Sequence, residues 1–107
     1  MKMVPKDPDS RVLELMREYN TDFSKEHEIE FFLYFKDIDA ANLAKIRLEK
    51  MDFDVEICKN ENSSTWLCLA YKRMLAEHSE LNRIRKRLEK LALRLNGEYD
   101  GWGTLIQ

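Results

Sequence analysis

The spacing of apolar residues from His27 onward constrains the fold more than any other feature of the sequence. Between residues 27 and 36, apolar and polar side chains alternate, which is typical of a strand with one buried face. Between residues 38 and 51, apolar residues recur at helical spacing. Strand-type alternation and helical spacing both recur after residue 51. The pattern therefore predicts strand, helix, strand, strand, helix and strand, in this order.

The first predicted strand and helix follow directly from this spacing. On the strand, one face carries a row of apolar side chains, namely Ile29, Phe31, Leu33 and Phe35. Carboxylates in the segment Asp37-Ile38-Asp39 are suited to cap the helix that follows. We expect the buried stripe of that helix to contain Ala40, Leu43, Ala44, Leu48 and Met51.

The second half of the chain repeats these signals. Strands at residues 53–58 and 65–73 are joined by a polar turn at residues 60–64, which predicts a hairpin. A long helix begins at His78, and Asn96-Gly97 supplies a left-handed stop signal. Its apolar stripe is Leu81, Ile84, Leu88, Leu91 and Leu95.

This order of elements predicts an α+β fold, the ferredoxin-like split βαβ sandwich. In that fold a four-stranded antiparallel sheet is covered on one face by both helices. We expect the domain to span residues 25–107. Residues 1–24 are expected to form a leader and an extra N-terminal accessory helix that starts near Arg11.

Composition narrows the class of protein. The chain has 107 residues, the size of one domain, and its 18 basic and 20 acidic side chains nearly cancel. Binding to nucleic acid or to an anionic membrane would therefore require a local patch. Cys58 and Cys68 lie in strand-like segments, which favours core thiols in a reducing compartment over a functional disulfide. We expect a cytoplasmic protein that does not enter a membrane.

The most specific motif is the segment Tyr99-Asp100-Gly101-Trp102-Gly103-Thr104. It resembles the signature that ends the regulator of ribonuclease activity B family, bacterial protein inhibitors of ribonuclease E. The resemblance extends more weakly over residues 25–107, including the strand near Asp52-Phe53-Asp54-Val55. It implies a ferredoxin-like domain and a cytoplasmic regulator of RNA decay. Such a protein binds the non-catalytic scaffold region of ribonuclease E.

Within this motif, Tyr99, Asp100 and Trp102 are candidates for a partner-binding edge, with Trp102 as an aromatic anchor. The alternative is structural. Glycines two positions apart around a tryptophan are typical of a bulged or closely approached strand, and an aspartate there can bond to neighbouring backbone groups.

Phe32 and Tyr34 are further candidates, because they should point away from the helices beside Trp66 or Tyr71 of the third strand. Aromatic side chains on an open four-stranded sheet are also how RNA-recognition modules stack bases, so RNA binding is an alternative. Glu28 and Glu30 would disfavour phosphate on this face. Such a face is equally suited to cover by a second copy, which makes a homodimer the other alternative.

The second long helix carries the one concentrated basic surface of the sequence. At helical spacing, its cations share a flank made of Arg83, Arg87, Lys90 and Arg94. The flank is either a solvated helix face or a site for an acidic protein segment or RNA.

Catalytic chemistry has little support in the sequence. His27 and His78 show no metal-ligand spacing, and neither cysteine lies near an activating basic cluster. We expect no catalytic residue, no metal site and no cofactor. We therefore expect a regulator that binds a protein partner, and the family resemblance implies a ribonuclease E-like nuclease as that partner.

Overall fold

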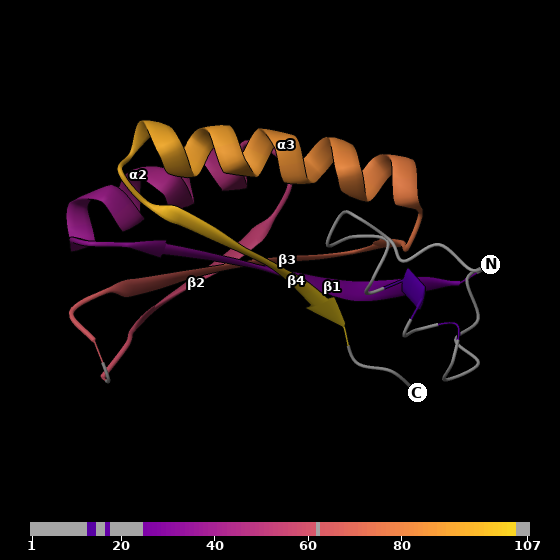
Figure 1. The fold of residues 1–107 in the computed structure, drawn as a ribbon, viewed down its shortest axis with the longest axis horizontal. Helices are drawn as coiled ribbons and strands as arrows, with labels where there is room; N and C mark the ends of the chain where they lie inside the picture. The colour runs from indigo at the N-terminus through magenta and orange to yellow at the C-terminus, as the bar shows by residue number, and fades with distance from the viewer. Residues whose placement is uncertain (1–12, 15–16, 18–24, 62, 105–107) are drawn as a thin grey trace, which may run out of the picture.

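The computed structural model describes residues 13–14, 17, 25–61 and 63–104 of the chain. Figure 1 shows its six elements, which follow the order predicted from the apolar spacing. They are β1 (Glu26–Phe35), α2 (Ile38–Glu49), β2 (Asp54–Lys59), β3 (Trp66–Leu75), α3 (His78–Arg94) and β4 (Glu98–Thr104). The accessory helix expected near Arg11 falls mostly outside the described residues.

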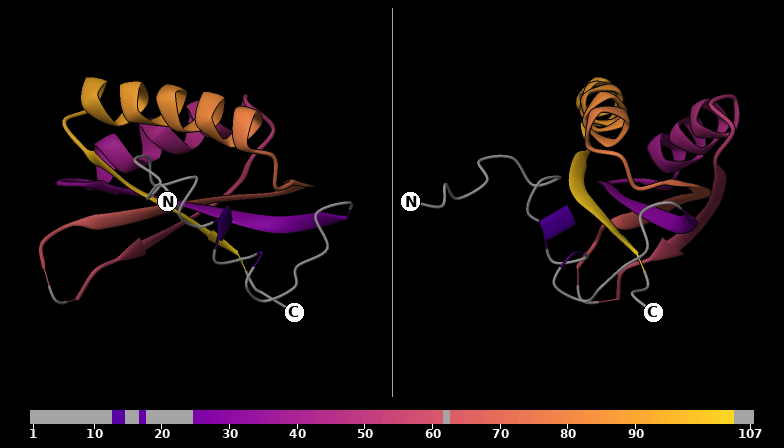
Figure 2. Two further views of the ribbon diagram at one scale, coloured as in Figure 1. Left: turned by 45° about the vertical axis from the view of Figure 1, so that its right-hand side comes forward. Right: turned by 90° about the vertical axis from the view of Figure 1, so that its right-hand side faces the viewer.

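The four strands form one antiparallel sheet in the order β2-β3-β1-β4. Both helices lie on the same face of this sheet, side by side (Figure 2). The long central strands β1 and β3 pair from Glu26 opposite Leu75 to Phe35 opposite Trp66. The predicted ferredoxin-like sandwich is therefore confirmed.

The core lies between the sheet and the helices. The apolar face of β1 is fully covered, and the predicted stripe of α3 is buried from Leu81 to Leu91. Phe31 meets the ring of Phe53 edge-on, with centroids 5.4 Å apart. The Nζ atom of Lys72 lies 4.7 Å from the centroid of the Phe53 ring, so a lysine on the inner face of β3 is held over an aromatic ring.

The ends of the helices confirm the predicted signals. The Oδ1 atom of Asp37 accepts a hydrogen bond of 2.8 Å from the backbone N–H of Ala40, which caps α2. After α3, Asn96 adopts the left-handed conformation with φ 56°. The N–H of Gly97 donates to the carbonyl of Ala92 at 2.7 Å, and that of Asn96 to Leu93 at 3.2 Å. This pair of bonds is a Schellman motif.

The predicted buried stripe of α2 is wrong at one position. Leu43 is 51% exposed, and the residues that face the sheet are Ala41, Ala44 and Leu48. Alanines at these positions let the helix backbone lie near β3, where Sγ of Cys68 is 4.0 Å from the carbonyl oxygen of Ala41. Leu43 and Ile46, both about half exposed, are left on the outer side of the helix.

Cys58 and Cys68 are both free thiols. Cys68 pairs with Ile57, whereas Cys58 pairs with Leu67, so the two cysteines point to opposite faces of the sheet. This geometry prevents a disulfide between them. Within the described part of the chain, no helix is long and apolar enough to cross a bilayer.

Candidate protein-binding surfaces

The motif at the end of the chain forms the edge strand β4 and contains a β-bulge. Trp102 pairs with Phe31 and Tyr99 with Leu33, so two residues of β4, Asp100 and Gly101, stand opposite one residue of β1. Gly101 has a φ of 98°, a backbone conformation that residues other than glycine rarely adopt. The bulge anticipated from the paired glycines is therefore present.

Burial within β4 favours the structural alternative for Trp102. Its side chain is only 6% exposed and belongs to the core, and the half-buried Tyr99 packs against that core. Asp100 is exposed on the bulge. At the end of the strand, Oγ1 of Thr104 donates a 2.7 Å hydrogen bond to the carbonyl of Glu28, which ties β4 to β1.

Phe32 and Tyr34 lie on the sheet face away from the helices, opposite Leu69 and Leu67 of β3. Tyr71 shares this face and is the diagonal neighbour of Phe32, as predicted. Trp66 does not share it. Because Trp66 pairs with Phe35, which is buried under the helices, its predicted place beside Phe32 is wrong.

The same sheet face carries carboxylates along its length. Tyr71 pairs with Glu30 on one side and Asp54 on the other. The pKa of Tyr71 is raised by partial loss of water around the phenol, and further by the negative charges of Glu56, Asp54 and Glu28. This face therefore has a negative potential that opposes a phosphate backbone.

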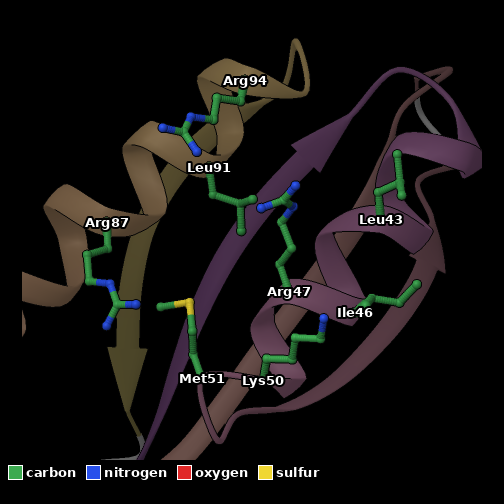
Figure 3. Close-up of a pocket in the computed structure, with 8 residues that line it drawn as sticks. All are labelled: Leu43, Ile46, Arg47, Lys50, Met51, Arg87, Leu91 and Arg94. Carbon is green, nitrogen blue, oxygen red and sulfur yellow. The ribbon is translucent and has the colours of Figure 1, made fainter.

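A groove of about 480 Å³ lies on the opposite side of the molecule, between α2 and α3. Figure 3 shows the side chains that line it, which come from both helices and from the turn after α2. They are Leu43, Ile46, Arg47, Lys50, Met51, Arg87, Leu91 and Arg94. Arg47 and Leu91 extend toward each other across the groove, and Met51 extends toward Arg87 (Figure 3).

The groove combines positive charge with exposed aliphatic surface. Each helix contributes two cations, Arg47 and Lys50 from the end of α2 and Arg87 and Arg94 from α3. The ion pairs observed on α3 in the described residues join Arg83 to Glu80 and Arg85 to Glu89, and include none of these four. Leu43 and Ile46 are 51% and 52% exposed, so apolar surface is open to solvent between the charges.

The structure divides the basic flank that the sequence predicted. Arg87 and Arg94 line the groove, whereas Lys90 is exposed outside its lining. Arg83 is held by Glu80, through an Nε to Oε2 hydrogen bond of 3.2 Å and a second bond from Nη2. This pair lowers the pKa of Glu80. Arg83 therefore forms an ion pair within α3.

Half of the groove was missed by sequence reasoning, because it comes from α2. Leu43 was predicted in the buried stripe of this helix, and none of its cations was predicted as a binding residue. The available signal was an apolar pair, Leu43 and Ile46, three positions apart and next to cations. This apolar pair indicates an exposed surface only once the alanines of α2 are known to face the sheet.

The thiol and metal chemistry of the described residues is limited. Burial raises the pKa of Cys68 to about 11, although the positive charge of Lys45 partly opposes this shift. Such a thiol is almost entirely protonated near neutral pH and is a weak nucleophile. In the described part of the chain, no three His, Cys, Asp or Glu side chains are placed to hold a metal ion.

Comparison with known families gives a match over nearly the whole chain. The family model described as regulator of ribonuclease activity B matches residues 6–104. A search of curated proteins found no match to the chain. The family match includes the bulged β4 motif that carried the resemblance, together with both helices that form the groove. The chain therefore belongs to the regulator of ribonuclease activity B family.

Proposed function

We propose that this protein inhibits a ribonuclease E-type nuclease in the bacterial cytoplasm by binding to it, without catalysis of its own. The observation that carries the proposal is the family match over residues 6–104, because the family is described as a regulator of ribonuclease activity. A regulator of this kind needs an accessible surface that recognises another macromolecule. It needs no reactive group.

Two surfaces support a protein partner. The groove between α2 and α3 places cations around exposed Leu43 and Ile46, and the opposite sheet face places Phe32 and Tyr34 among carboxylates. Both combine apolar surface with charged side chains, positive around the groove and mostly negative on the sheet face, as protein interfaces with a polar rim do. Of the candidate residues, Arg87 and Arg94 lie in the first surface, Phe32 and Tyr34 in the second, and Asp100 on the bulge of β4.

The test uses the purified protein and ribonuclease E from the same organism. At about 150 mM salt, where long-range attraction between exposed charges is largely screened, we expect the two proteins to co-elute from a sizing column. We also expect slower cleavage of a natural transcript when the regulator is added. Co-elution without slower cleavage would contradict inhibition, and absence of both would overturn the proposal.

The same preparation separates the two alternatives. An RNA-binding module would retain a labelled RNA oligonucleotide, with an affinity that falls steeply as salt rises. The carboxylates around Tyr71 oppose this outcome on the sheet face. A homodimer would show a sedimentation coefficient that rises with concentration and is reduced by Phe32→Glu. Two copies packed through this face would bring their carboxylates together, which disfavours that arrangement.

A further inference from the structure

We propose that the groove between α2 and α3 is a docking site for an amphipathic helical segment of a protein partner, with acidic side chains flanking an aliphatic stripe. The inference rests on the proposed function in taking the partner to be a protein. It adds the location of the contact and the chemistry of the segment that binds there.

Charge complementarity is the first argument. Arg47, Lys50, Arg87 and Arg94 surround a groove of about 480 Å³, and the ion pairs observed in the described residues leave all four out. Repulsion among cations gathered at one groove is relieved when a ligand brings carboxylates between them. Three of them are arginines, whose planar guanidinium groups bind carboxylates through paired hydrogen bonds.

The exposed apolar side chains are the second argument. Leu43 and Ile46 are about half exposed on α2 and line the same groove as Met51 and Leu91. An acidic ligand without apolar groups would leave this surface in water. A helix with leucine or isoleucine at every third or fourth position would cover it, while its flanking glutamates or aspartates would reach the arginines.

The lining also argues against RNA as the occupant. Proteins that bind single-stranded RNA stack its bases on aromatic side chains, and the lining of the groove includes no aromatic residue. The aromatic side chains Phe32, Tyr34 and Tyr71 lie on the opposite face of the sheet, among carboxylates. The cations and the aromatic residues therefore do not form one continuous surface for a short RNA segment.

Two direct probes test the chemistry of the groove. The first is a fluorescent peptide of about 18 residues, designed as a helix with a leucine stripe flanked by glutamates. A peptide of identical composition with the leucines dispersed around the helix is its control. The second probe is a labelled single-stranded RNA of about 20 nucleotides, long enough to span one binding module. Binding is measured by anisotropy at about 150 mM salt.

The protein variants are matched in pairs. Arg87→Glu reverses a charge in the groove, and Lys86→Glu makes the same reversal on α3 outside the lining. Ile46→Ser removes apolar surface from the groove, and Leu93→Ser removes it from a site that is 77% exposed and outside the lining. All four residues are exposed, so each variant should fold, and a thermal melt of each variant checks this.

We expect the striped peptide to bind more tightly than its control. We also expect Arg87→Glu and Ile46→Ser each to weaken it by about tenfold, the effect of losing one strong contact, while their partners change it by less than about twofold. The RNA should not bind. RNA binding lost in Arg87→Glu would overturn the proposal and identify a nucleic-acid site. Equal effects within each pair, or no preference for the striped peptide, would also overturn it.

The same four variants are then tested for co-elution with ribonuclease E. Loss of co-elution in the groove variants alone supports the inference together with the proposed function. If every variant still binds the nuclease, the proposed function stands and the groove is not its contact. If the unaltered protein does not bind the nuclease, the proposed function fails, and the peptide measurement decides the inference by itself.

Discussion

A Cβ atom added to Gly97 would lie 2.3 Å from Cδ1 of Phe35, and 2.6 Å from the carbonyl oxygen of Tyr34. Gly97 ends the Schellman motif of α3 and begins the path into β4, so its backbone passes directly against β1. We expect Gly97→Ala to lower the free energy of unfolding by about 3 kcal/mol, because a core side chain and a strand must both shift. Urea unfolding measures this loss.

Gly103→Ala is the matched control, since it makes the same change on β4 where the nearest atom, Cε2 of Phe32, is 3.9 Å from the added Cβ. We expect it to change stability by less than about 0.5 kcal/mol, as at an uncrowded surface position. Equal losses in the two variants would contradict the close approach at Gly97.

Trp102→Ala should unfold the protein more easily, whether or not a partner is present. The side chain is almost fully buried beside Phe31, so its removal leaves a large cavity, and we expect a loss of about 3 to 5 kcal/mol. Asp100→Ala, on the exposed part of the bulge, is the comparison and should cost far less. A stable Trp102→Ala variant that failed only in partner binding would contradict the structural role.

Asp37→Ala removes the side-chain cap of α2. The hydrogen bond from Ala40 is lost, and we expect the free energy of unfolding to fall by about 1 kcal/mol. Asp37→Asn keeps an oxygen acceptor at the same position and should restore most of this stability. A thermal melt of both variants is sufficient, and an equal loss in both would show that the cap bond is not the cause.

The two thiols should react at very different rates. Cys58 is exposed, whereas Cys68 is buried with a pKa of about 11. At about pH 8 we expect a thiol reagent to modify Cys58 rapidly, and Cys68 only after unfolding, because the thiolate is the reactive form. The variant Cys58→Ser should show no fast reaction. Two fast thiols in the unaltered protein would contradict the burial of Cys68.

Cys68 should also make stability depend on alkaline pH. Well below its ordinary pKa of 9.0, the thiol is protonated in both the folded and the unfolded chain, so no dependence arises. Between about pH 9 and 11 the unfolded chain loses this proton more readily, and folding becomes less favourable by roughly 1 to 2 kcal/mol. Cys68→Ala lacks this contribution, so its stability deficit should shrink over the same interval. An unchanged deficit would contradict the raised pKa.

The elements were predictable because their signals are local. Alternation around Ile29 and Phe31 specifies which face of β1 is buried, and Asp37 and Asn96 mark helix ends through their own hydrogen bonds and backbone preferences. The order of strand-type and helix-type apolar spacing along the chain then predicted the ferredoxin-like sandwich. The bulge in β4 was also anticipated, because glycines around Trp102 suit few other strand geometries.

The groove was less predictable, because it depends on how two helices lie against each other. The apolar residues of α2 surround much of its circumference, so the sequence did not distinguish Leu43 from Ala41 as the inward residue. The same limit applies to Trp66, whose face is set by its pairing with Phe35. Both errors concern tertiary placement. Once Leu43 is placed on the outer side of α2, the contribution of this helix to the groove follows.

The cations around the groove lie on the helical side of the molecule, and the carboxylates around Tyr71 lie on the far side of the sheet. The net charge is only −2, yet the described residues carry a charge asymmetry directed across the sheet. A charged partner at a distance experiences a torque before it experiences contact, so the two molecules rotate toward a productive orientation while they are still diffusing. The speed of association should therefore respond to ionic strength far more than the small net charge alone would suggest.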